Sequence, residues 1–156
     1  MTIKLYRHPL SGHSHRAELM LSLLGLQAEL IDVDLLNGAH KKPEFLALNS
    51  FGQVPVLDDN GTVISDSNGI LVYLARRYDK DYRWFPLHPA VQAEVQRFLS
   101  VAAGPVAFGP AAARLVNVFG AGLNHQEAID RAEQILESLN EVLAERQWLA
   151  GDLTIA

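Results

Sequence analysis

The chain of 156 residues contains no cysteine. This absence excludes disulfide bonds, zinc–thiolate sites and CxxC redox pairs. Any thiol chemistry at this protein must therefore act on a thiol that a ligand brings in. The sequence also shows no grouping of histidines and carboxylates that suggests a metal site, so we expect no metal.

Positive charge is scarce as well. Thirteen Lys and Arg residues stand against eighteen Asp and Glu residues, which gives a net charge of -5. This balance argues against general binding to nucleic acid or to anionic membrane surfaces. The first ten residues, MTIKLYRHPL, lack the long apolar core of a signal peptide, and we expect no apolar run of membrane-spanning length. We therefore expect a cytoplasmic protein that does not bind membranes.

What is present is the composition of a globular protein, with 49% hydrophobic residues. Apolar alternation predicts strands at residues 2–6, 29–34, 54–57 and 62–64. Helical spacing predicts helices at residues 11–24, 43–48 and 67–78. A right-handed crossover would make the first two strands parallel, and the Asn60-Gly61 turn would make the last two antiparallel. These elements predict an α/β thioredoxin-like domain with a mixed four-stranded sheet.

An all-α domain is expected after this first domain. Residues 79–89 are charged, aromatic and rich in proline, as in a linker, so the predicted organisation is residues 1–78, linker 79–89 and helical residues 90–156. Asn124, with Glu127 three residues later, predicts the start of a long helix that ends near Arg146. Further helices are expected at residues 90–103 and 111–119, with a break or a kink at Gly104-Pro105 and Gly109-Pro110.

Two stretches carry a specific pattern. Residues 38–57 end in Gln-Val-Pro-Val-Leu, and residues 64–75 contain Asp-Ser-x-x-Ile. Together they resemble the N-terminal domain of glutathione S-transferases. Ser11, followed by Arg16, resembles the serine-type classes, theta and phi among them. The resemblance implies an enzyme that joins the thiolate of glutathione, its co-substrate, to a small hydrophobic electrophile.

The resemblance is distinctive over residues 3–78 and rests on helix pattern beyond them. Residues 151–156 look like the start of the family's helix-capping motif Ser/Thr-x-x-Asp, with Thr154 as the cap. Family members continue for several more helices. The resemblance therefore implies a C-terminally incomplete chain.

Ser11 is the candidate catalytic residue. A hydroxyl at the start of a helix can donate a hydrogen bond to the bound sulfur, which favours the thiolate and lowers the thiol pKa. The alternative is that Ser11 only caps the helix. Ser14, one turn further on, is a second candidate hydroxyl, and Tyr6 is expected to serve in strand packing.

Six further residues are predicted to bind glutathione. His40 and Lys41 match family residues that meet the glycine carboxylate, and Gln53 can bind the ligand by its side chain. Pro55 matches the family's cis-proline, which would leave the backbone of Val54 facing the glutathione peptide. Asp66 and Ser67, at a helix start, suit the γ-glutamyl ammonium and carboxylate.

Phe51 is the candidate for self-association. It stands where family members carry an aromatic residue that inserts between two helices of a second subunit, so the resemblance implies a homodimer whose partner surface includes residues 90–99. Two other functions remain open: a catalytically silent glutathione-transferase-like binding module, and a related glutathione-dependent peroxidase or dehalogenase.

Overall fold

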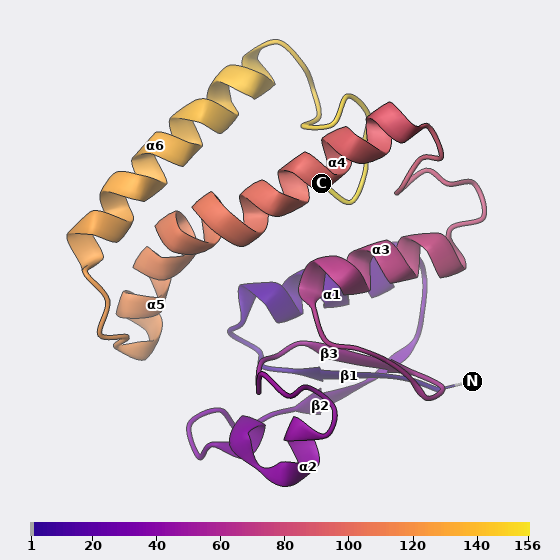
Figure 1. Ribbon diagram of the computed structural model, residues 1–156, viewed down its shortest axis with the longest axis vertical. Coiled ribbons are helices and arrows are strands. Elements are labelled where there is room, and N and C mark those ends of the chain that lie inside the picture. Colours follow the sequence, from indigo (N-terminus) through magenta and orange to yellow (C-terminus); the bar gives the residue numbers. More distant parts are fainter. Residues whose placement is uncertain (1) are drawn as a thin grey trace. The chain divides into compact units, whose positions relative to one another are not determined.

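The computed structural model describes residues 2–156 (Figure 1). It consists of two compact units, the first ending at Tyr82 and the second running from Arg83 to Ala156. The boundary between the units lies within residues 79–89, the stretch whose composition resembles a linker.

The first unit is built on a mixed four-stranded sheet in the order β2-β1-β3-β4. β1 lies parallel to β2 and antiparallel to β3, and β3 lies antiparallel to β4. The predicted thioredoxin-like sheet is therefore confirmed. The strands are β1 (Ile3–Arg7), β2 (Ala28–Asp32), β3 (Val56–Asp59) and β4 (Thr62–Ile64).

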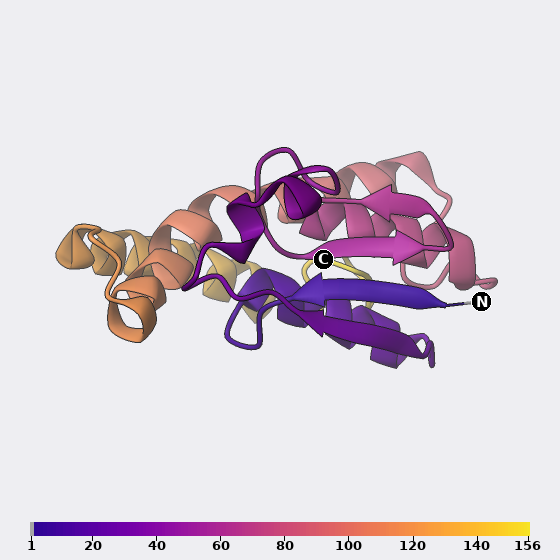
Figure 2. The same cartoon turned by 90° about the horizontal axis from the view of Figure 1, so that it is seen from below.

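Helices cover both faces of this sheet. α1 and α3 lie on one face and the short α2 lies on the other (Figures 1 and 2). On the second face Phe45 of α2 belongs to a buried cluster with Val56, and its ring meets Tyr6 edge-on at 6.3 Å between centroids. Tyr6 thus packs against the core, as expected. The helical elements are α1 (Gly12–Leu23), the 3-10 turn η1 (Ala39–Lys41), α2 (Pro43–Leu46) and α3 (Ser67–Tyr78).

The strand register brings the segments that carry the predicted site residues to the same end of the sheet, where β1 and β4 end and β3 begins. Tyr6, near the end of β1, pairs with Val56 at the start of β3. Ile64, at the end of β4, pairs with Leu57. The loop after β1, the segment before β3 and the start of α3 therefore meet at the same end. The Val54–Pro55 peptide bond, in that segment, is cis.

A buried carboxylate lies at the opposite end of β3. Asp59 is 5% exposed and accepts hydrogen bonds from the hydroxyls of Tyr73 at 2.8 Å and Tyr78 at 2.6 Å. Burial raises the pKa of Asp59, but the hydrogen bonds from Tyr78, Tyr73 and Asn60, together with the positive charge of Arg77, outweigh burial and hold that pKa below its usual value. This cluster joins the β3–β4 hairpin to α3.

The second unit is helical, as predicted, but the two Gly-Pro pairs do not break it. Pro105 and Pro110 lie inside a continuous π-helical stretch, η2. A proline ring collides with the carbonyl of residue i−4 in a regular α-helix, whereas wider π-turns, with i→i+5 bonds, accommodate it. The elements are α4 (Pro89–Val101), η2 (Ala102–Ala111), α5 (Ala112–Phe119) and α6 (His125–Ala144).

The helical stretch Pro89–Phe119 has 31 residues and is apolar enough, by length and composition, to cross a membrane. The expectation that no apolar run reaches this length is therefore wrong, because the intact η2 joins two helices that the sequence separated. The core helices of soluble proteins meet the same criterion.

Hydrogen bonds hold the start of α6 and the last residues of the second unit. Asn124 caps α6 by accepting a hydrogen bond from the Glu127 N–H at 3.2 Å, as the sequence predicts. Thr154 is buried and its hydroxyl accepts from the Ala156 N–H at 3.2 Å. The Ile155 N–H donates to the Trp84 carbonyl at 2.9 Å, which ties this segment to the start of the unit.

Candidate functional site

Ser11 is the N-cap of α1. Its Oγ accepts a hydrogen bond from the Ser14 N–H at 3.2 Å, and its own N–H donates to the His8 carbonyl at 2.9 Å. Neither bond uses the hydroxyl proton. The side chain is half-buried, so capping and donation to a ligand are compatible at this position.

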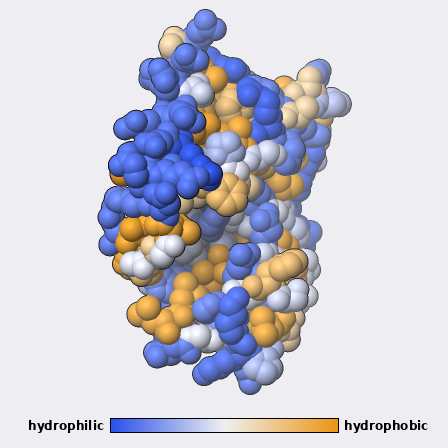
Figure 3. Space-filling model, turned by 60° about the vertical axis from the view of Figure 1, so that its left-hand side comes forward, coloured by the Kyte–Doolittle hydropathy of each residue, from blue (hydrophilic) through white to orange (hydrophobic). Residues whose placement is uncertain are grey.

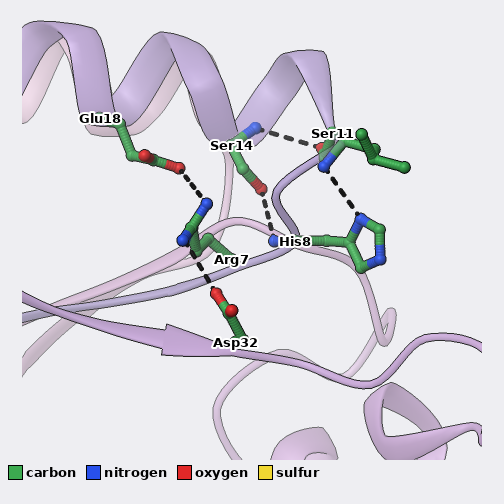
Figure 4. Close-up of polar contacts among 7 residues, drawn as sticks. Arg7, His8, Ser11, Ser14, Glu18 and Asp32 are labelled. Carbon is green, nitrogen blue, oxygen red and sulfur yellow. Dashed lines mark hydrogen bonds and ion pairs between the residues drawn. The ribbon is translucent and has the colours of Figure 1, made fainter.

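Ser14 has a different environment. It is fully buried, and its Oγ accepts from the His8 N–H at 3.2 Å (Figure 4). The Leu10 N–H in turn donates to His8 Nδ1 at 3.2 Å. Ser14 therefore holds the loop that leads from β1 into α1, whereas Ser11 is the residue at its outer end.

Arg7 fixes the strand that carries this loop. Its Nη1 lies 3.5 Å from Glu18 Oε1 on α1, and its Nε lies 2.9 Å from Asp32 Oδ1 on β2 (Figure 4). One guanidinium thus joins three elements of the first unit, and the loop after it begins from a fixed point.

Asp66 and Ser67 lie together at the start of α3. Asp66 is exposed and caps the helix, its Oδ1 accepting from the Gly69 N–H at 2.6 Å. Ser67 is 6% exposed, and its Oγ lies 2.9 Å from His13 Nδ1. His13 thus links the start of α1 to the start of α3.

His13 is a site residue that the sequence patterns do not single out. The side chain is exposed, but its hydrogen-bond partner lies 54 positions further along the chain, which no local pattern reveals. Partial desolvation of the ring and, second, the nearby Arg16 lower the pKa of His13, while Asp66 acts in the opposite direction. Arg16 itself has its pKa lowered by burial, an effect that Asp66 opposes.

Lys41 is tied to the loop before β3. Its Nζ donates to the carbonyls of Phe51 at 3.2 Å and Gly52 at 3.3 Å. Gly52 has φ +61°, and a Cβ there would stand 2.7 Å from the His40 carbonyl oxygen. The loop and η1 are therefore in direct contact, with the Lys41 ammonium beside the backbone.

Asn49 gives the same loop its shape. It is buried; its Oδ1 accepts from the Phe51 N–H at 3.0 Å and its Nδ2 donates to the Gln53 carbonyl at 2.8 Å. The Gln53 side chain is exposed and Val54 is half-buried. No sequence pattern predicts this role for Asn49, because the residue resembles an ordinary loop asparagine.

The predicted residues therefore form two groups at one end of the sheet. The first group is Ser11 at the start of α1 with Asp66 and Ser67 at the start of α3, which His13 links. The second group is His40, Lys41, Gln53 and Val54. His40 Nδ1 is buried and has no hydrogen-bond partner within residues 2–156. Within the same residues, no group of three or more histidine and acidic side chains could hold a metal ion.

Comparison with known proteins identifies the family. Residues 1–76 match the family described as glutathione S-transferase, N-terminal domain. The chain is 35% identical to glutathione S-transferase 3 of Zea mays, covering 96% of this chain and 71% of that protein. It is 30% identical to glutathione S-transferase theta-2 of Homo sapiens, covering 97% of this chain and 65% of that protein.

Solved structures give the same result. A glutathione transferase of Bombyx mori superposes with a TM-score of 0.88 at 29% identity, over 99% of this chain and 72% of that one. A delta-class glutathione transferase of Nilaparvata lugens gives a TM-score of 0.87 at 34% identity, over 98% and 72%. From its motifs, its mixed sheet and these relatives, we conclude that the chain belongs to the glutathione S-transferase superfamily.

Proposed function

We propose that this protein is a serine-type glutathione transferase, which activates the thiol of glutathione for attack on a small hydrophobic electrophile. The observation that carries the proposal is the Ser11 hydroxyl, which caps α1 through its oxygen and keeps its proton for a ligand. The other nearby serine, Ser14, is fully buried against the His8 backbone.

The surrounding groups support glutathione as the co-substrate. Glutathione carries two carboxylates, an ammonium, two peptide units and a thiol. Ser67 and Asp66 offer a hydroxyl and a carboxylate to the γ-glutamyl end, and His40 with Lys41 offers donors to the glycine end. Val54 and Gln53, in the segment before β3, suit the peptide units.

In this proposal Ser11 acts on the ligand's sulfur. A free thiol has a pKa of about 8.5, so most of it is protonated at neutral pH. A hydroxyl that donates to the sulfur stabilises the thiolate and lowers this pKa. The thiolate then attacks the electrophilic carbon, forms the C–S bond and displaces the leaving group or adds to the double bond.

The test compares Ser11→Ala with Ser14→Ala. A hydrogen bond to a charged group contributes about 1.5–3 kcal/mol. Ser11→Ala should therefore raise the pKa of bound glutathione by about one unit and lower turnover about tenfold or more, with a smaller effect on affinity. Ser14→Ala should mainly destabilise the fold. The measurement is the pH dependence of glutathione conjugation to an aryl halide.

Three outcomes would contradict the assignment in different ways. No glutathione binding at millimolar concentration would exclude the function altogether. Binding without conjugation to any of a panel of electrophiles would favour a silent binding module. A pKa shift in Ser14→Ala but not in Ser11→Ala would reverse the roles of the two serines.

The proposal includes a homodimer held through Phe51. This side chain is 79% exposed, yet the backbone around it is fixed by Asn49 and Lys41. An exposed aromatic on a rigid loop is the usual type of interface anchor, because little conformational freedom is lost when it is buried.

A groove in the helical unit is a suitable receiver for Phe51 of a second copy. It has a volume of about 440 Å³ between η2 and α6, whereas benzene fits a cavity of about 150 Å³. Its apolar lining includes Pro105, Phe108 and Ile135. Several apolar residues of the expected partner surface 90–99 are instead buried within their own unit, namely Val95, Phe98 and Leu99.

Light scattering on purified protein tests the dimer. The unchanged chain should have the mass of two copies at micromolar concentration, and Phe51→Ala should shift it to one copy. Leu36→Ala is the matched control, because Leu36 is 87% exposed in the same unit. A monomeric unchanged chain, or a dimer that survives Phe51→Ala, would refute this interface.

Cytoplasmic location is part of the same proposal. Cell fractionation should place the protein in the soluble fraction. Recovery in the membrane fraction after an alkaline wash would contradict it.

A further inference from the structure

The contact between His13 and Ser67 joins the two helices that carry the proposed thiol-binding and carboxylate-binding groups. His13 is the second residue of α1 and Ser67 is the first of α3, and Nδ1 lies 2.9 Å from Oγ. Ser67 is 6% exposed, whereas His13 is exposed. A ligand that approaches the Ser67 hydroxyl therefore meets the imidazole as well.

The hydroxyl of Ser67 has one proton to give. If His13 Nδ1 carries no proton, it accepts a hydrogen bond from the Ser67 hydroxyl. The Ser67 oxygen then presents only lone pairs to a ligand. If Nδ1 carries a proton, it donates to Oγ and leaves the hydroxyl proton for the ligand. The protonation of His13 thus decides whether Ser67 is a donor or an acceptor, and a carboxylate needs a donor.

Two charged groups face His13. Arg16 lies on its own helix, α1, and Asp66 is the N-cap of α3. Burial and Arg16 lower the pKa of His13 and Asp66 opposes them, with a net shift downward. The neutral imidazole is therefore favoured at neutral pH in the ligand-free chain. A bound carboxylate adds a negative charge beside the ring, which raises the pKa again.

We propose that His13 is a positioning residue for the free α-carboxylate of the γ-glutamyl group, which it serves by holding a proton on Nδ1 and so turning Ser67 into a donor. The inference rests on the proposed function. A neutral ring can do this by carrying its proton on Nδ1 instead of Nε2, and the negative charge of the bound carboxylate further favours the doubly protonated ring, which takes its second proton from solvent. Because the ring is then more basic in the complex than in the free chain, affinity for glutathione should rise as pH falls through the imidazole range.

The experiment is isothermal titration calorimetry with glutathione between about pH 5.5 and 8.5, where an imidazole titrates. The variants are His13→Leu, which removes the ring nitrogens, and His13→Asn, which keeps an N–H donor that does not titrate. His15→Asn is the control, because His15 is exposed on the same helix. The second ligand is γ-aminobutyryl-cysteinyl-glycine, which lacks only the α-carboxylate.

We expect His13→Leu to bind glutathione about five- to tenfold more weakly than the unchanged chain at the acidic end of this range, as for one lost hydrogen bond. Its pH dependence should be flatter. His13→Asn should recover most of the affinity while also losing the pH dependence, and His15→Asn should change neither. The ligand without the carboxylate should bind the unchanged chain and His13→Leu equally.

The failures are distinguishable. If glutathione does not bind the unchanged chain, the proposed function and this inference both fall. If it binds, and His13→Leu keeps both the affinity and the pH profile, only this inference falls. It also falls if the loss in His13→Leu is the same for the ligand without the α-carboxylate, because the effect would then be a general one on the site.

Discussion

The two units bury their apolar residues to different extents. In the first unit Leu5, Val56, Leu57, Ile70 and Leu74 are fully buried, so the sheet and its helices form a closed core. In the second unit, Val95 and Leu99 are the large side chains that reach the same burial, and both units expose large apolar side chains. Hydrophobic patches are visible on the face shown in Figure 3. The exposed side chains of the second unit include Phe108, Leu115, Val118, Phe119, Leu123, Leu136 and Leu143, and those of the first unit include Leu10, Leu19, Leu23, Leu30, Leu36 and Phe51. The first unit therefore derives more of its stability from its own packing.

The largest effect should come from the core of the first unit. Leu57 is completely buried, so Leu57→Ala should destabilise that unit by about 2–5 kcal/mol. Leu136 is 55% exposed in the second unit, and Leu136→Ala should cost less than about 0.5 kcal/mol. Urea denaturation followed by circular dichroism measures both.

The same experiment can show whether the units unfold separately. Both tryptophans, Trp84 and Trp148, lie in the second unit, so tryptophan fluorescence reports on that unit. Leu57→Ala should move the circular dichroism transition more than the fluorescence transition. An equal shift in both signals would mean that the two units unfold together, and would remove the contrast between them.

An intermediate effect is expected at the carboxylate cluster of the first unit. Tyr78→Phe removes a hydrogen bond to Asp59 and should destabilise the protein by about 1.5–3 kcal/mol at neutral pH. The folded-state pKa of Asp59 is held below its usual value, so the contribution is complete above the unfolded pKa of about 3.9 and is lost as pH falls through the folded pKa.

Thermal melts of Tyr78→Phe and the unchanged chain should therefore converge in acid. Tyr82→Phe is the control, because Tyr82 is 43% exposed, and it should change stability little at any pH. A difference for Tyr78→Phe that stays constant into acid would show that the bond does not depend on the charge of Asp59.

A smaller effect tests the packing of the second unit. A Cβ at Gly109 would stand 2.9 Å from the Ala132 nitrogen on α6, whereas a Cβ at Gly104 meets nothing within 4 Å. Gly109→Ala should therefore destabilise the second unit by about 1–3 kcal/mol, and Gly104→Ala should be neutral or slightly stabilising. The midpoint of the tryptophan fluorescence transition measures both variants. Equal midpoints would mean that η2 and α6 separate easily.

The contrast between the units also explains what sequence could predict. Local signals determine much of the first unit: the Asn60-Gly61 turn, the N-cap Ser11 and the helix start at Ser67 lie where their spacing predicts. The His13–Ser67 and Asp59–Tyr78 bonds were missed, because they join residues far apart in the chain. In the second unit the Gly-Pro pairs do not interrupt the helical stretch. Their effect could not be predicted from the sequence, because it depends on which helical geometry the surrounding residues adopt.

The π-helical stretch η2 also alters the direction of the side chains that follow it. Each π-turn holds about one residue more than an α-turn, so ten residues of η2 complete fewer rotations than ten residues of α-helix would. The phase of α5 is therefore offset from that of α4, although the two share one continuous backbone. Deleting a residue within 102–111 would change that phase, and α5 would then present a different set of side chains to α6.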